Sequence, residues 1–339
     1  MKLFRVFVVT LLLILPAALV SAARIEISSP GEQTIPLAVT RLLPLAAPQA
    51  RGKAMVNILP IPSGVSIAAI MPVDRAEEEW EKLQIVFATS AGDVRRNALS
   101  DFTNVMRNGK IAMDLPEGVE MVNARICSGT DDVMLVTEAG RAIRFPVRDV
   151  RVFKGRKSTG VRGIRLQPGD RVVSMSVIDH FEASPDERAA YLKMRRAAAG
   201  MAEEEPAEDE PRADVALTPA RFAEMQAAET LILTITARGT GKLGSSHDYP
   251  VRGRGGMGVA AMDRAMRGGP LVASFPVGRE DQIMLATSRG QSIRVPVEGI
   301  SYRSRNAGGV RVFDTGKGEE VVSVAWIADQ SDTADEPAS

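Results

Sequence analysis

The sequence predicts an all-β fold: a β-propeller of about four and a half four-stranded blades, interrupted by a short, helical and acidic insertion. The first observation behind this prediction is a repeat of short β-type runs, each closed by a glycine turn. The turn glycines lie 48 residues apart at Gly92 and Gly140, and 51 residues apart at Gly239 and Gly290. The second observation is physical: one blade cannot bury both faces, so blades must pack on one another around an axis.

Each full repeat shows the same order of strands. The first strands and their turns occupy Leu83–Gly92, Asp132–Gly140, Leu231–Gly239 and Asp281–Gly290. The second strands each carry a cation, namely Arg95, Arg144, Lys242 and Arg294. The third strands each begin at a glycine, namely Gly109, Gly160, Gly258 and Gly309. Fourth strands follow, such as Arg171–Val177 and Glu320–Trp326. Counting four strands per unit places each third strand in the blade of its own repeat.

The N-terminal residues differ from the repeats. Residues 1–23 resemble a secretory signal peptide, because Lys2 and Arg5 precede an apolar run that ends in small residues. The run is short for a membrane span, and a buried strand or helix is the alternative interpretation. Residues 24–42 alternate like one short strand and then turn. This leader resembles the start of mature TolB, a periplasmic propeller protein.

The remaining boundaries follow from the repeat. We expect a partial blade at 43–73, full blades at 80–130 and 131–179, and two further blades within 230–328. The insertion at 180–229 should contain a helix from Ser184 to about Ala198 and a second from Thr218 to about Ala228, because Ser-Pro and Thr-Pro are typical helix starts. The run 203–211 is acidic, contains proline and is expected to be disordered, and 329–339 is a second acidic tail.

Charge is balanced overall but unevenly distributed, with 42 Lys and Arg against 42 Asp and Glu. Residues 48–179 hold 19 cationic and 16 acidic side chains, and residues 230–328 hold 13 and 8. The insertion 180–229 holds 6 cationic and 12 acidic side chains, and the tail 329–339 holds none and 4. The predicted blades are therefore basic and their appendages acidic.

The cations gather beside the third-strand glycines, at matching places in successive repeats. If the blades are equivalent, these loops lie around the perimeter, where Lys and Arg can contact phosphates and glycine lets backbone N–H groups approach closely. Taken singly, each is an ordinary solvated loop, but their recurrence favours duplex DNA. The candidate DNA-binding residues are Arg95, Arg96, Arg107, Lys110, Arg144, Lys154, Arg156, Lys157, Arg162, Arg165, Lys242, Arg252, Arg254, Arg294, Arg303, Arg305 and Arg311.

Other chemistries find little support. One cysteine, Cys127, excludes an internal disulfide, and two distant histidines disfavour a metal or catalytic cluster. The Gly253–Gly258 run fits a dinucleotide-binding pattern but lies among β hairpins, and Thr315–Gly318 lacks the phosphate-loop spacing. Aromatic residues are 4% of the chain, too few to stack single-stranded nucleic acid. We expect no cofactor, no metal and no small-molecule substrate.

From about Leu43 to Ala328 the chain resembles the C-terminal domain of DNA gyrase A, in the alphaproteobacterial form that has a helical insertion. The stretches that carry the resemblance are Pro48–Pro60, Asn108–Met113, Ile143–Arg156, Ser158–Leu166 and Asp281–Leu285. The resemblance implies a β-pinwheel, a propeller variant whose perimeter bends and wraps duplex DNA to support negative supercoiling. It also implies, as partners, duplex DNA and the gyrase catalytic core, formed by the rest of gyrase A and by gyrase B.

The chain departs from the family pattern in two ways. The family's domain has six blades, whereas the repeats found here lack the first blade and the front half of the second, including the Gln-Arg-Arg-Gly-Gly-Lys-Gly box. The cleavage half with its catalytic tyrosine and the ATP site are also not found, since Tyr191, Tyr249 and Tyr302 lie outside any such motif. The resemblance therefore implies a non-catalytic module of an ATP-hydrolysing topoisomerase.

The signal-like segment conflicts with the gyrase resemblance, because gyrase acts on cytoplasmic DNA at the nucleoid and a signal peptide would direct the chain to the periplasm. One hypothesis is that the reading frame joins a TolB-like leader to a truncated gyrase tail near Arg41–Leu45. The alternatives to a DNA-wrapping module are a secreted propeller that acts as a protein-interaction scaffold, and a non-functional truncated product. Salt-dependent binding to duplex DNA separates the DNA-wrapping interpretation from the others.

Overall fold

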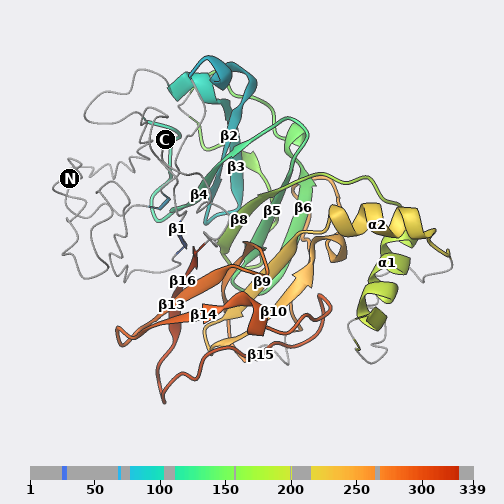
Figure 1. Cartoon of the computed structure of the whole chain (residues 1–339). Coiled ribbons are helices and arrows are strands. Elements are labelled where there is room, and N and C mark those ends of the chain that lie inside the picture. Colours follow the sequence, from blue (N-terminus) through green and yellow to red (C-terminus); the bar gives the residue numbers. More distant parts are fainter. Residues whose placement is uncertain are drawn as a thin grey trace, which may run out of the picture.

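The computed structural model describes residues 25–28, 68–69, 77–102, 111–155, 158–198, 200, 215–263 and 268–327. These residues form four antiparallel four-stranded sheets, the blades, arranged around one axis (Figure 1). The strands β4, β8, β12 and β16 line the axis, because each contacts the next in this order. The predicted all-β propeller of four-stranded blades is confirmed.

The blades are built from hairpins at the predicted places. Blade 1 contains β2 (Gln84–Thr89), β3 (Asp93–Ala98) and β4 (Met121–Cys127). Blade 2 contains β5 (Asp132–Thr137), β6 (Arg141–Pro146) and β8 (Val172–Ile178). Blade 3 contains β9 (Leu231–Thr236), β10 (Thr240–Ser245) and β12 (Leu271–Val277). Blade 4 contains β13 (Gln282–Thr287), β14 (Ser292–Pro296) and β16 (Val321–Ile327). Each second strand ends in a short 3-10 helix: η3 (Leu99–Phe102), η4 (Val147–Asp149), η5 (Ser246–Asp248) and η6 (Val297–Gly299). A further 3-10 helix, η2 (Glu77–Lys82), precedes β2.

The third strands of the second, third and fourth repeats each complete the preceding blade, so their assignment to their own blades was wrong; the one expected at Gly109 lies outside the described residues. The strand β7 (Val161–Arg162) pairs with β3 of blade 1, β11 (Val259–Ala260) with β6 of blade 2, and β15 (Val310–Arg311) with β10 of blade 3. The chain leaves each second strand through its 3-10 helix and runs beside the preceding blade, where single parallel bridges such as Arg96 to Val152 guide it. The spacing of the repeats alone cannot predict this, because the second strand of its own blade and that of the preceding blade offer the third strand equivalent edges.

Glycine precedes the exchanged strands because no larger residue fits there. Gly160 has φ of +99°, and a Cβ on it would lie 2.3 Å from the carbonyl oxygen of Val94 in β3. Gly258 has φ of +68°, and its Cβ would lie 2.2 Å from the carbonyl oxygen of Ala142 in β6. Positive φ and backbone contact at this distance both require glycine. The glycines seen in the sequence are therefore part of the joints between blades.

The hydrophobic core lies mainly between blades. Val86 of β2, Leu135 of β5 and Phe145 of β6 are fully buried in one cluster, which also includes Ile164 just after β7. A second cluster joins blades 3 and 4, and a third joins blades 2 and 3. Full burial of a side chain of this size contributes about 1.5–3 kcal/mol. Each blade is thus stabilised by its neighbour.

The insertion between β8 and β9 contains the two predicted helices, α1 (Pro185–Ala198) and α2 (Pro219–Ala227). At the start of α1, the backbone N–H of Glu187 donates to Ser184 Oγ at 3.1 Å, and Ser184 N–H donates to Glu187 Oε2 at 2.8 Å. This reciprocal pair is a capping box. At the start of α2, Thr218 Oγ1 accepts from Arg221 N–H at 3.2 Å. The predicted disordered run 203–211 lies outside the described residues.

The leader contributes one described strand. Within the predicted leader, β1 (Ile25–Ser28) pairs antiparallel with β16, with Glu26 opposite Trp326. The signal-like segment 1–23, the rest of the leader, the tail 329–339 and almost all of the partial blade 43–73 lie outside the described residues, so these boundaries stay predictions. No helix in the described part of the chain is long and apolar enough to cross a membrane.

We predict that Gly258→Ala lowers the free energy of unfolding by about 1–3 kcal/mol, because the new Cβ meets strained φ and the Ala142 backbone. The matched control is Gly253→Ala in the same loop, where a Cβ meets nothing within 4 Å, and we expect a change within about 0.5 kcal/mol. Urea denaturation measures both. Equal effects would mean that the exchanged strand does not need glycine.

Candidate nucleic-acid interface

Five of the predicted DNA-binding cations are inside the protein. Their exposed fractions are between 0% and 8%, and they are Arg95, Arg96, Arg144, Lys242 and Arg305. Side chains at this depth cannot meet a phosphate on the perimeter without unpacking, so we remove them from the candidate interface. The side chains of four of them contact a neighbouring repeat, whereas that of Arg96 contacts Gln84 of its own blade.

Lys242 and Arg95 hold the loop that arrives from the next repeat. Both are the third residue after a turn glycine. Lys242 Nζ donates to the carbonyl oxygens of Ser304 at 2.8 Å and Ala307 at 2.7 Å, in the loop before β15. Arg95 Nη1 donates to the carbonyl oxygen of Ser158 at 2.7 Å, in the loop before β7. These carbonyl oxygens partly compensate the cost of burying the charges.

Arg305 and Arg96 make similar internal contacts. Arg305 Nη1 donates to the carbonyl oxygen of Ala260 in β11 at 2.6 Å, and its Nε donates to that of Asp248 in η5 at 3.0 Å. Arg96 Nη1 donates to Gln84 Oε1 in the neighbouring strand β2 at 3.0 Å. Arg305 therefore connects its own repeat to η5 and β11, both of which belong to the repeat before it.

Arg144 is the centre of a charged network at one end of blade 2, where β6 ends, η4 follows and β5 begins. We call this end of a blade, with its 3-10 helix, the outer end. Its Nε lies 2.8 Å from Asp132 Oδ2, and its Nη1 and Nη2 donate to the carbonyl oxygens of Ser246 at 2.9 Å and Asp179 at 3.1 Å. His180 Nδ1 lies 2.9 Å from Asp132 Oδ1. Burial lowers the pKa of His180, but its hydrogen bonds to Glu182 and to Asp132 together outweigh that effect and raise it. The network joins blade 2 to η5 of blade 3.

We predict that Arg144→Met lowers the free energy of unfolding by about 3–5 kcal/mol, because it removes the guanidinium beside the buried Asp132 carboxylate and leaves only the partly exposed His180 to pair with it. The control is Arg294→Met, since Arg294 also stands fourth after a turn glycine but is exposed. There we expect a change within about 0.5 kcal/mol. Chemical denaturation followed by circular dichroism measures both. A similar loss in the two variants would contradict the internal role of Arg144.

The other predicted cations divide into three groups. The exposed ones are Lys154, Arg162, Arg165, Arg252, Arg254, Arg294 and Arg311. Arg303 is half-buried. Four lie outside the described residues: Arg107, Lys110, Arg156 and Lys157. Two exposed arginines close to these residues in the chain were missed by the sequence interpretation, Arg148 of η4 and Arg151 just after it. Their signal was present, because Arg148, Arg151 and Lys154 recur at every third residue.

Seven exposed cations lie on two loops, 148–165 and 252–254, which the structure brings together. We call them the blade 2 basic surface: Arg148, Arg151, Lys154, Arg162, Arg165, Arg252 and Arg254. Arg254 crosses between the loops, since its Nε donates to the Asp149 carbonyl oxygen at 2.9 Å and its Nη1 to that of Arg162 at 3.0 Å. The backbone N–H of Arg165 donates to the Gly256 carbonyl oxygen at 2.8 Å. Repeats 2 and 3 therefore build one surface.

The blade 2 basic surface has little opposing charge. Asp149 is the one carboxylate among described residues 147–165 and 251–257, and Asp93 of β3 lies opposite Arg162. Arg151 lies over the ring of Phe153, 4.1 Å from its centroid, which orients the guanidinium. Exposed cations with so few acidic neighbours give a local positive potential that attracts a polyanion. The arrangement can bind phosphates without reading bases.

The remaining predicted cations that the structure describes outside the protein interior are Arg294, Arg303 and Arg311. Arg311 is on β15 and its Nη1 lies 3.5 Å from Asp314 Oδ2. Arg294 lies on β14 of blade 4 and Arg303 in the loop that reaches blade 3. These three come from the fourth repeat, whereas the blade 2 basic surface is built by repeats 2 and 3. Whether they contact DNA stays a prediction.

The insertion docks on blade 3 around His247 of η5. Its ring centroid lies 5.0 Å from that of Tyr191 in α1 and 5.6 Å from that of Phe181. His247 Nε2 lies 2.8 Å from the carbonyl oxygen of Met225 in α2, so it donates that hydrogen bond. Burial lowers the pKa of His247. The imidazole is therefore neutral at pH 7 and its protonation opposes docking.

We predict that acid weakens this docking through His247. Because the folded-state pKa is below its ordinary value of 6.5, the contribution is present above pH 6.5 and is lost as the pH falls. The free energy of unfolding should therefore fall less between about pH 7 and pH 5 in His247→Gln than in the original chain. The opposite sign is expected for His180, whose raised pKa favours the folded state at low pH. Denaturant titrations at several pH values of the original chain, His247→Gln and His180→Gln measure this, and parallel curves would contradict the prediction.

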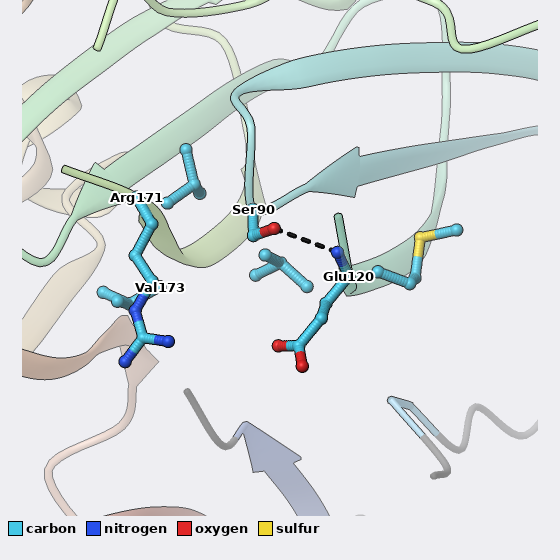
Figure 2. Close-up of a pocket in the computed structure, with 7 residues that line it drawn as sticks. Ser90, Glu120, Arg171 and Val173 are labelled. Carbon is cyan, nitrogen blue, oxygen red and sulfur yellow. Dashed lines mark hydrogen bonds between the residues drawn. The ribbon is translucent and has the colours of Figure 1, made fainter. Parts of the chain in front are cut away.

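A small hollow in the described part of the chain is far too small to hold a substrate. It is between the first residues of β4 and β8, where Glu120 N–H donates to Ser90 Oγ at 3.0 Å and Arg171 lies on the other side (Figure 2). Its volume is about 10 Å³, against roughly 300–1,000 Å³ for small-molecule sites. Within the residues that the structure describes, no group of three or more His, Cys, Asp or Glu side chains could hold a metal ion.

The repeats match a known family. The family described as "DNA gyrase C-terminal domain, beta-propeller" matches residues 84–128, 131–179, 230–269 and 281–325, which are the four blade repeats. This chain belongs to that family. The four blades and the exchanged third strands described above are therefore features of a member of this family.

Individual relatives agree with this assignment. The chain is 45% identical over 296 residues to the DNA gyrase A protein of Granulibacter bethesdensis, covering 83% of this chain and 32% of that protein. It thus spans about a third of the length of this relative. The fold is also that of two solved structures. One is the C-terminal domain of DNA topoisomerase IV, with a TM-score of 0.59 at 20% identity over 80% of this chain and 69% of that one. The other is a DNA gyrase A C-terminal domain, with a TM-score of 0.57 at 18% identity over 81% of this chain and 75% of that one.

Proposed function

We propose that this chain is the non-catalytic DNA-binding and DNA-wrapping module of DNA gyrase A, and that it bends duplex DNA around its perimeter to support negative supercoiling. Membership of the gyrase C-terminal domain family supports the proposal. The observation that carries it is the blade 2 basic surface, where segments from two repeats present seven exposed cations beside two carboxylates, Asp93 and Asp149.

The work proposed is mechanical. Bending 20–30 base pairs of duplex by 40–90° costs on the order of 1–6 kcal/mol, which distributed phosphate contacts must offset. Arginine suits this role because its guanidinium binds phosphate oxygens in a fixed geometry. The exposed arginines come from successive loops along the perimeter and not from one helix that could enter a groove. Recognition is therefore of the backbone and independent of base sequence.

We further propose that the chain catalyses nothing alone. In this view the DNA-cleaving tyrosine and the ATP site belong to the gyrase catalytic core, formed by the rest of gyrase A and by gyrase B. The partners are then duplex DNA and this core, and the location is the cytoplasm, at the nucleoid. The gyrase relatives support this location over the secreted, TolB-like scaffold.

We predict that the triple variant Arg151→Gln, Arg165→Gln and Arg252→Gln weakens binding to duplex DNA and flattens its salt dependence. Each lost phosphate contact should lower the slope of log affinity against log salt by about 0.9. Fluorescence anisotropy with a labelled duplex of about 40 base pairs, titrated at several salt concentrations, measures this. The loss should be similar for unrelated DNA sequences, because these contacts are to the backbone.

The control variant is Arg279→Gln, which removes an exposed cation in the connection between β12 and β13, outside the basic surface. The three substitutions of the triple variant are also made one at a time. Arg279→Gln should reduce the salt slope much less than any of these single variants. Negligible duplex affinity of the original chain at low salt would overturn the proposed function. An equal effect of Arg279→Gln and of each single change would place the interface elsewhere.

A further inference from the structure

The insertion covers the outer end of blade 3 at the place where blade 2 is open. In blade 2, η4 leaves Arg148 and Asp149 exposed. In blade 3, the equivalent η5 is buried throughout, at Ser246, His247 and Asp248. The loop that arrives beside each blade shows a weaker contrast of the same sign: Val251, bridged to Arg144 of blade 2, is half-buried, whereas its counterpart Tyr302, bridged to Leu243 of blade 3, is 8% exposed. In Figure 1, α1 and α2 lie outside the sheets, beyond β6 and β10.

The cations of α1 are used for this docking. Arg195 Nε lies 3.2 Å from Glu229 Oε2, and its guanidinium lies 5.0 Å from the centroid of the Tyr302 ring. Arg196 Nη2 lies 3.5 Å from Asp248 Oδ1 in η5. These arginines face the blade and are largely buried, so they offer little positive charge to a ligand outside.

The outward side of the insertion is acidic. Glu182 and Glu224 are 93% and 62% exposed at the side chain, and Asp186 at the start of α1 is exposed too. Lys193 is the exposed cation of α1. A DNA duplex that follows the perimeter from blade 2 thus meets a bulky element of its own charge sign at blade 3.

We propose that the α1–α2 insertion ends the DNA track at blade 3 and so limits the length of duplex that this domain holds. The inference rests on the proposed function, and it concerns where the DNA-binding part of the perimeter ends. The mechanism is mainly occlusion: the helices occupy at blade 3 the place that the basic surface leaves open at blade 2. The exposed carboxylates add repulsion.

The chain supplies the design for a test. The other described connections between repeats are four residues long, Ser128–Asp131 and Gly278–Asp281. Replacing residues 180–229 by the dipeptide Arg-Glu, copied from Arg279 and Glu280, gives the third connection the same length. Asp179 and Thr230 are kept, because their carbonyl oxygens accept from Arg144 Nη2 and from Ser246 N–H.

The measurement is hydroxyl-radical footprinting of a long linear duplex with each protein. We expect the shortened protein to protect about 10 more base pairs than the original, one more turn of the double helix facing the protein. In case the replacement impairs folding, the double variant Tyr191→Ala and Phe222→Ala removes the ring pair, 5.1 Å apart, inside the insertion, and should lengthen the footprint in the same direction.

The matched control is Glu182→Gln with Glu224→Gln, which lowers the charge but leaves the helices docked. Its footprint should stay within a few base pairs of the original, since occlusion remains, and a full lengthening would overturn occlusion as the cause. A footprint of unchanged length in the folded shortened protein, with normal protection by the original, would overturn this inference and leave the proposed function intact. Absence of protection by the original protein would overturn both.

Discussion

The structure depends on the exchange of one short strand between successive repeats. β7, β11 and β15 each supply backbone hydrogen bonds to the outer edge of the preceding blade. Without them, the second strand of that blade would present unpaired N–H and C=O groups, which favours association with other chains. The exchange also carries the connecting loops outward and lays them beside one another. The perimeter surface is therefore a by-product of the way the blades are joined.

This dependence explains why the positive side chains have two roles. Lys242 and Arg305 donate hydrogen bonds to backbone carbonyl oxygens of neighbouring repeats, and so they stabilise the joints between blades. Arg162 and Arg252 lie on the corresponding exchanged segments of the second and third repeats, but they are exposed. Burial decides between the roles, because a buried cation has already exchanged water for protein acceptors and cannot exchange them again for a phosphate without a large cost. A count of cations along the sequence therefore overestimates the interface.

The insertion shows how one departure from the repeat changes the perimeter. Two helices between β8 and β9 pack on η5 through an imidazole enclosed by aromatic rings. The same element turns Arg195 and Arg196 inward, and Glu182 and Glu224 outward. Blades 2 and 3 are thus alike in their strands but unlike at the 3-10 helices that follow β6 and β10. In a gyrase C-terminal domain, a binding surface that is limited to part of the perimeter would set both the path and the length of the bound duplex.

The strand hairpins, the turn glycines, both helix starts and the family could all be predicted from the order of the residues. Each depends on residues close together in the chain, as in the capping box of Ser184 and Glu187. The strand partners could not be predicted in this way, because β7 has two equally spaced blades from which to choose. Which cations are exposed could not be predicted either. Arg144 and Arg294 are each the fourth residue after a turn glycine, but Arg144 is buried beside the Asp132 carboxylate and Arg294 is exposed. Local sequence specifies conformation, whereas the neighbouring blade specifies which side chains still face water.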